Sequence, residues 1–185
     1  MADKPFRLKT ANCGLVIVDI QEKFRPAVPA FDTVAANAEK LIKAFKLLAI
    51  PILATEQYPK GLGPTVANVS TVLGSVTPVI KKCFSGSCAA GFMEELESRR
   101  IKTLCVCGIE THVCIYQTVL DLIREGIQTV VVIDACGSRK EVDHATALRR
   151  MELSGAIVMT VEMALFELLG TADHPAFREI QGLVK

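Results

Sequence analysis

The stretch that decides the fold is GLVIVD, residues Gly14–Asp19. It is a continuous apolar run, rich in β-branched residues, that ends at a carboxylate. Such a run is typical of a strand in a parallel sheet, because helices bury both faces of that sheet. Thr103–Cys107 (TLCVC) and Gln128–Ile133 (QTVVVI) have the same character, so the sequence predicts a parallel sheet built around these strands.

Helical patterns alternate with the strands. A connection over Glu56–Pro78, rich in glycine and proline, contains one short helix near Thr65–Val72. The other expected strands are Ile50–Thr55, Val79–Ile80 and Ala156–Met159, and the other expected helices are Phe31–Ala49, Ala89–Arg100, Cys114–Glu125, Glu141–Ser154, Glu162–Leu169 and Pro175–Leu183. This alternation predicts a single three-layer α/β/α domain over residues 8–185, preceded by a short tail over residues 1–7. Its sheet is mostly parallel, roughly six-stranded and doubly wound (Rossmann-like), so ligands are expected beyond the carboxyl ends of the strands.

Composition narrows the classes of function. The 185 residues are 50% hydrophobic and carry a net charge of +1 without a basic tract, which argues against disorder and against nucleic acid as a partner. No apolar run approaches the ~18 residues of a membrane span, and the N-terminus lacks the apolar core of a secretory signal. The mean hydropathy of +0.36 predicts a homo-oligomer, a dimer or larger, with apolar surface between subunits.

The seven cysteines form no C-x-x-C pair, and their number is odd. This is neither a disulfide framework nor a zinc ribbon. We therefore expect mostly buried, reduced thiols and a reducing intracellular compartment, the cytoplasm, with mitochondria left open.

Three reactive side chains stand at the expected strand ends. Asp19 follows the first strand, Lys81 the third, and Cys114 lies a short turn beyond the fourth, at the expected start of a helix. A helix N-terminus and a nearby ammonium both lower the pKa of a thiol, and a carboxylate can take its proton. Each residue also has a structural interpretation in packing or capping. Lys82, the next residue, is an alternative to Lys81 as the lysine of the site. A binding or scaffold protein remains open, whereas a nucleotide-binding domain is disfavoured because no Gly-rich phosphate motif follows the first strand.

Longer segments around these residues carry a resemblance. GLVIVDIQEKF (14–24), KKCFS (81–85) and GIETHVCIYQTVLD (108–121) resemble the isochorismatase-like superfamily of cysteine hydrolases. TEQYPKGLG (55–63) and HPAFREIQGLVK (174–185) are similar to the eukaryotic isochorismatase-domain-containing proteins. The resemblance covers nearly the whole chain from Leu8, and Gly-x-x-Thr-x-x-Cys, ending at Cys114, is its most specific element.

The resemblance implies a catalytic triad Asp-Lys-Cys. Asp19 matches the general base and Cys114 the nucleophile, and Lys81 rather than Lys82 matches the lysine because Ser85 completes the motif Lys-x-x-x-Ser. The family also carries a non-proline cis peptide bond in the cysteine turn. It falls here between Ile109 and Glu110, and the N–H groups of Glu110 and Cys114 would form an oxyanion hole.

The implied activity is hydrolysis of a small amide, a non-peptide C–N bond, through a thioester acyl-enzyme. The alternatives are isochorismatase-type ether hydrolysis and a catalytically weak scaffold member of the family. The family's lysine motif usually continues Ser-x-Phe, whereas Ser85-Gly86-Ser87 here predicts a smaller or more polar pocket wall. Candidates for binding the small-molecule substrate are Gln21, Phe24, Glu56, Gln57 and Tyr58.

Neither a metal nor another cofactor is expected. Metal-binding nicotinamidases of the superfamily place an Asp and several His between the base and the lysine. The histidines of this chain, His112, His144 and His174, all lie outside that interval. A catalytic metal needs about three such ligands, so nicotinamidase activity is not expected. His112 lies two residues before Cys114, but the family uses the aspartate as base.

Overall fold

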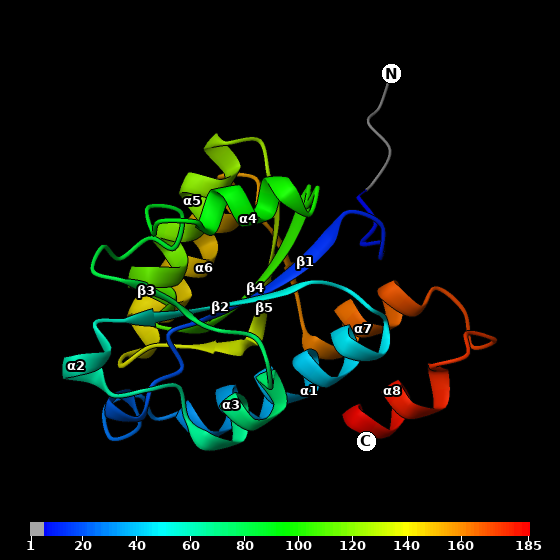
Figure 1. Ribbon diagram of the computed structural model, residues 1–185, viewed down its shortest axis with the longest axis horizontal. Helices are drawn as coiled ribbons and strands as arrows, with labels where there is room; N and C mark the ends of the chain where they lie inside the picture. Colours follow the sequence, from blue (N-terminus) through cyan, green and yellow to red (C-terminus); the bar gives the residue numbers. More distant parts are fainter. Residues whose placement is uncertain (1–5) are drawn as a thin grey trace.

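The computed structural model describes residues 6–185 and has a six-stranded sheet at its centre (Figure 1). Its order is β3-β2-β1-β4-β5-β6, and every neighbouring pair is parallel. The strands are β1 (Cys13–Val18), β2 (Ile52–Gln57), β3 (Val79–Lys81), β4 (Thr103–Ile109), β5 (Gln128–Gly137) and β6 (Ile157–Met159). The order reverses between β1 and β4, and ligands of such sheets bind at this switch point.

Helices cover both faces of the sheet, which confirms the predicted three-layer α/β/α fold (Figure 1). One layer contains α1 (Phe31–Leu47), α3 (Ala67–Leu73), α7 (Val161–Leu169) and α8 (Phe177–Val184), and the other contains α4 (Phe92–Ser98), α5 (Tyr116–Arg124) and α6 (Glu141–Leu153). Three short elements complete the chain: the 3-10 turn η1 (Glu22–Phe24), helix α2 (Pro59–Leu62) and the π-helical turn η2 (Thr111–Ile115). Strand β1 is fully buried, and so is β4 after its first residue, as their continuous apolar runs predict.

Several boundaries differ from the sequence prediction, and two of these differences have a local cause. Strand β5 continues past Ile133 to Gly137, because its register against β4 shifts and exposed Asp134 lies at the irregularity. The Asp134 carboxylate accepts a hydrogen bond from the backbone N–H of Val161, the first residue of α7, at 2.8 Å. Helix α4 begins later than predicted because Gly91, at φ 84°, interrupts the helical backbone.

The start of the domain packs against the C-terminal part of the chain. The backbone N–H of buried Leu8 donates to the Glu167 carboxylate of α7 at 2.8 Å. Residues 1–5 of the expected N-terminal tail lie outside the described residues. From residue 6 onward, no helix is long and apolar enough to cross a membrane.

Gly108 allows β1 and β4 to approach each other where both reach the site. Its φ is 132°, and a Cβ there would lie 2.0 Å from the carbonyl oxygen of Val18. We expect Gly108→Ala to lower the free energy of unfolding by more than about 3 kcal/mol, because backbone atoms cannot yield as a flexible side chain can. Thermal unfolding measures this, with Gly182→Ala in α8 as the control, since nothing lies within 4 Å of its added Cβ. Equal stability of both variants would contradict the close approach.

Candidate active site

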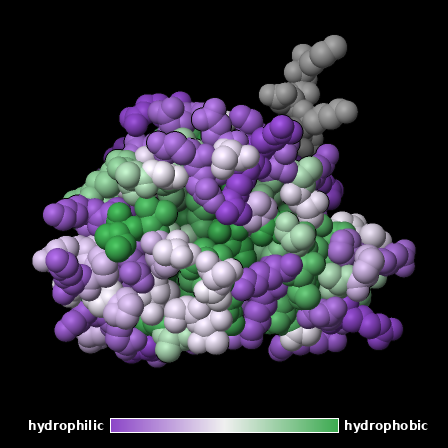
Figure 2. Space-filling view, in the orientation of Figure 1, coloured by the Kyte–Doolittle hydropathy of each residue, from purple (hydrophilic) through white to green (hydrophobic). Residues whose placement is uncertain are grey.

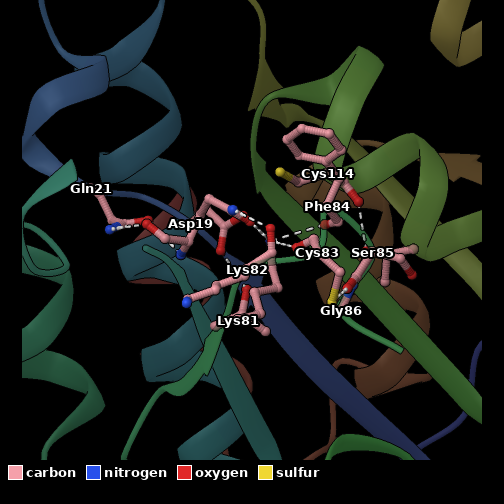
Figure 3. A network of polar contacts seen from close by, with 12 residues as sticks. Asp19, Gln21, Lys81, Lys82, Cys83, Phe84, Ser85, Gly86 and Cys114 are labelled. Carbon is pink, nitrogen blue, oxygen red and sulfur yellow. Dashed lines mark hydrogen bonds and ion pairs between the residues drawn. The ribbon is translucent and has the colours of Figure 1, made fainter. Parts of the chain in front are cut away.

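The carboxyl ends of β1 and β3 bring together a buried ion pair. Asp19 follows β1 and Lys81 ends β3, and the Nζ of Lys81 lies 2.6 Å from Oδ2 of Asp19 (Figure 3). Both side chains are 0% exposed. The hydroxyl of Thr55, from the intervening strand β2, donates to Oδ1 of Asp19 at 2.7 Å. Lys82 is exposed, so the structure brings Lys81 and not its neighbour to Asp19.

Cys114 reaches the same edge from the turn after β4. The peptide bond between Ile109 and Glu110 is cis, where the resemblance placed one. The turn η2 follows and carries Cys114, which is 4% exposed. The Thr118 hydroxyl donates to the Cys114 carbonyl at 2.6 Å and accepts from the Gly86 N–H at 2.7 Å. This hydroxyl therefore joins the cysteine turn to the loop after Lys81.

The pKa of Cys114 differs from the sequence expectation. Local position predicts a lowered value, but the pKa of this thiol is raised to about 12. Burial is the largest cause, the Asp19 carboxylate also raises the pKa, and the Lys81 ammonium lowers it. Cys114 lies inside the π-helical turn before α5, and loss of solvent outweighs the nearby positive charge. At neutral pH Cys114 is therefore a protonated thiol.

A disulfide joins Cys83 and Cys88, whereas the sequence predicts mostly buried, reduced thiols and no disulfide framework. The other five cysteines, Cys13, Cys105, Cys107, Cys114 and Cys136, are free and buried. The sequence offered no signal because the spacing is not C-x-x-C, and only the turn over residues 83–88 brings the two sulfurs together.

Thiol counting checks this disulfide. In a denaturant without reductant, five thiols per chain are expected to react with a chromogenic disulfide reagent. After reduction and removal of the reductant, all seven cysteines are expected to react. Seven thiols before reduction, in protein purified without reductant, would contradict the bond.

Three of the residues proposed for substrate binding, Gln21, Glu56 and Gln57, form side-chain hydrogen bonds within the chain. The amide nitrogen of buried Gln21 donates to the carbonyls of Gln57 and Gly63 at 3.1 and 2.6 Å. Oε1 of Glu56 accepts from the backbone N–H and the hydroxyl of Thr65, at 2.7 and 2.8 Å. Of the two aromatic candidates, Phe24 is half-buried against the core and Tyr58 is 50% exposed. The fifth candidate, Gln57, contacts Lys81 at 2.8 Å.

Comparison with models of known protein families shows to which family the chain is related. Residues 13–163 match the model of the isochorismatase domain. The chain belongs to the isochorismatase family.

The relatives extend over nearly the whole chain. Isochorismatase domain-containing protein 2A of Mus musculus is 44% identical over 180 residues, which are 97% of this chain and 85% of that protein. The solved structure of MAR1 ribonuclease from Caenorhabditis elegans is 38% identical, with a TM-score of 0.91 over 97% of this chain and 92% of that chain. An octameric hydrolase of unknown specificity from Escherichia coli has a TM-score of 0.85 at 24% identity, over 97% of both chains, and shares the fold. The predicted family is thus confirmed.

Where isochorismatase-like proteins usually read Ser-x-Phe, Ser87 makes a structural link. Its hydroxyl lies 2.7 Å from that of Ser85 and donates to Asp121 of α5 at 3.0 Å. Ser87 therefore links the loop after Lys81 to α5, the helix that follows Cys114. Sequence reasoning missed this link, as it missed Thr55 and Thr118, because serine and threonine in these elements carry no distinctive pattern.

Two histidines of this isochorismatase-family chain, His112 and His144, lie within hydrogen-bond distance of nearby hydroxyl groups. Nδ1 of His112 lies 3.0 Å from the Ser138 hydroxyl, and Nδ1 of His144 lies 2.9 Å from the Thr111 hydroxyl. Burial lowers the pKa of His144. Across residues 6–185, no group of three or more His, Cys, Asp or Glu side chains is arranged to hold a metal ion.

Proposed function

We propose that this protein hydrolyses a small amide through a thioester on Cys114, with Asp19 as the base. The observation that carries the proposal is the solvent-free Asp19–Lys81 pair, whose charges both act on the Cys114 thiol. A protonated, buried thiol needs a base within reach, and Asp19 is the carboxylate that influences it most strongly.

The proposed reaction begins at the sulfur. As Sγ of Cys114 attacks the amide carbonyl carbon, its proton moves to Asp19 and the C=O electron pair moves to oxygen. When the C–N bond breaks, Asp19 returns that proton to the leaving nitrogen, and a thioester remains. Water then attacks the thioester with Asp19 again as base, which releases the carboxylic acid and restores the thiol.

The other groups of the proposed site stabilise the negative charges that develop on the sulfur and on the carbonyl oxygen. The Lys81 ammonium favours the anionic form of the sulfur. The backbone N–H groups of Glu110 and Cys114, at the cysteine turn, are the proposed oxyanion donors. Glu110 itself is held by Arg139, whose Nε donates to its carboxylate at 2.8 Å.

Two other reactions compete with amide hydrolysis. Isochorismatase-type ether hydrolysis needs no cysteine nucleophile, so it leaves Cys114 unexplained. A relative that is 38% identical is a ribonuclease, which makes RNA a second substrate to test. The net charge of +1 and the buried reactive groups favour a small neutral amide over a polyanion.

Mass spectrometry of the intact chain tests the proposal. The protein is mixed with a library of small amides and esters, and RNA is assayed in parallel. We expect an acyl adduct on the Cys114 peptide, absent in Cys114→Ser but retained in Cys136→Ser, a variant of a buried thiol on β5. Substrate turnover by Cys114→Ser, or RNA cleavage without any adduct, would contradict the thioester mechanism.

We further propose that the chain forms a homo-oligomer. Several large apolar side chains are exposed: Ile80 (65%), Phe84 (52%), Val142 (67%), Leu153 (78%) and Met163 (53%). Figure 2 shows apolar surface in the middle of one face, and a hollow of about 670 Å³ is lined in part by Ile52, Leu53 and Val76. Exposed apolar surface of this kind often marks subunit contacts.

Sedimentation velocity at low micromolar concentration measures the assembly. We expect a species of at least twice the 20.0 kDa chain mass. A fully active single species at the mass of one chain would contradict the oligomer.

A further inference from the structure

The three protons of the Lys81 ammonium all have acceptors within the chain. Nζ lies 2.6 Å from Asp19 Oδ2, 2.8 Å from Gln57 Oε1 and 2.9 Å from the Phe84 carbonyl, and the Cys83 carbonyl is farther away at 3.4 Å (Figure 3). An ammonium has only three N–H donors. Lys81 therefore has no free donor for a substrate unless one of these contacts breaks.

One strand supplies a contact to each member of the ion pair. Thr55 and Gln57 are two residues apart on β2, so their side chains lie on the same face of the sheet. Thr55 donates to Asp19, and Gln57 accepts from Lys81. Since β2 is paired with β1 on one side and with β3 on the other, it sets the placement of the base relative to the cation.

The amide of Gln57 is held at both ends. Its Nε2 donates to the carbonyl of Lys82 at 2.8 Å, which requires Oε1 to face the ammonium. Its backbone N–H donates to Oε1 of Gln21 at 2.8 Å, and the residue is 8% exposed. With Oε1 facing the ammonium and one N–H of Nε2 bonded to Lys82, the Gln57 amide is held within the chain, and only its second N–H is left for the direct substrate binding proposed from the sequence.

We infer that Gln57 is a positioning residue that acts through Lys81. It holds the ammonium where its charge reaches both Asp19 and the Cys114 sulfur, and this inference rests on the proposed hydrolase mechanism. Without the Gln57 acceptor, one buried N–H of Lys81 loses its partner, and the ammonium is free to move toward another acceptor. Misplacement of a catalytic group by ~1 Å can cost about a hundredfold in rate.

Kinetics and alkylation of Gln57→Leu test the inference. We expect kcat to fall about ten- to a hundredfold with KM little changed, because the group acts on the chemical step. We also expect iodoacetamide to alkylate Cys114 more slowly at mildly alkaline pH, because a displaced ammonium stabilises the thiolate less. Gln57→Glu keeps an oxygen beside the ammonium and is expected to retain more turnover than Gln57→Leu. Gln181→Leu, a glutamine of α8, is the matched control and should behave as the native chain.

The outcomes separate this inference from the proposed function. A folded Gln57→Leu with native kcat and native alkylation of Cys114 overturns the positioning role, and so does a change confined to KM, which would indicate direct substrate contact. If Gln57→Leu does not fold, Gln57→Met and Gln57→Glu undergo the same measurements, and native alkylation in Gln57→Met overturns the role. Because alkylation needs no substrate, it still decides on Gln57 if the protein hydrolyses no amide.

Discussion

Asp19→Asn is expected to lose turnover while its Cys114 becomes more reactive toward iodoacetamide. Loss of the general base lowers kcat by about 10²- to 10⁴-fold. The Asp19 carboxylate raises the pKa of Cys114 and the Lys81 ammonium lowers it, so removing only the negative charge lowers this pKa below its value of about 12. More thiolate is then present at any given pH below that value, and alkylation accelerates. A merely structural role for Asp19 predicts no such increase.

Measurement of both quantities on the same preparation makes this prediction decisive. Hydrolysis is followed with the best amide from the library, and alkylation with mass spectrometry of the Cys114 peptide across neutral and alkaline pH. Asp173→Asn, at an exposed position in the segment before α8, is the charge-matched control and should change neither. Near-native turnover by Asp19→Asn would remove Asp19 from the mechanism. Slower alkylation would show that its charge does not act on the thiol in the stated direction.

Lys81→Met is expected to lose turnover as well, but with the opposite effect on alkylation. The ammonium is the group that lowers the pKa of Cys114, so its removal raises that pKa and leaves less thiolate at a given pH. The Asp19 carboxylate also loses the counter-charge at 2.6 Å in a site without solvent. Removing one partner of a buried pair typically destabilises a fold by about 3–5 kcal/mol, and loss of electrostatic stabilisation lowers kcat by about 10²- to 10³-fold.

Lys82→Met is the natural control, because Lys82 is adjacent in sequence but exposed. It should keep native turnover, native stability and native alkylation of Cys114. Thermal unfolding separates loss of the fold from loss of chemistry in Lys81→Met. Loss of turnover in Lys82→Met with retention in Lys81→Met would reverse the assignment of the lysine.

The parallel sheet and the candidate residues at its strand ends were predictable from local patterns. Apolar runs such as Leu15–Val18 identify buried parallel strands because only a sheet covered on both faces needs them. Asp19 and Lys81 follow from their places at strand ends. The irregular extension of β5 was not predictable, because an exposed Asp134 inside a strand depends on the register against β4.

The partners of each catalytic candidate were beyond sequence patterns. The contact of Gln57 with Lys81 joins residues 24 positions apart, and that of Thr55 with Asp19 joins residues 36 positions apart. Both contacts exist because strand pairing brings β1, β2 and β3 side by side. Because of the same pairing, the amides of Gln21 and Gln57, which the sequence suggested as substrate contacts, form hydrogen bonds within the chain.

The sequence by itself determined the fold class, the family and the residue types at the strand ends, because these depend on apolar periodicity and on short motifs. Only the tertiary structure determined the pKa of Cys114 and the disulfide in the loop after Lys81. Local position alone predicted a lowered pKa for the thiol, whereas burial raises it to about 12. The Cys83–Cys88 disulfide likewise depends on the path of the loop. Solvent exclusion and the approach of two side chains are properties of packing, and a linear pattern of residues does not contain them.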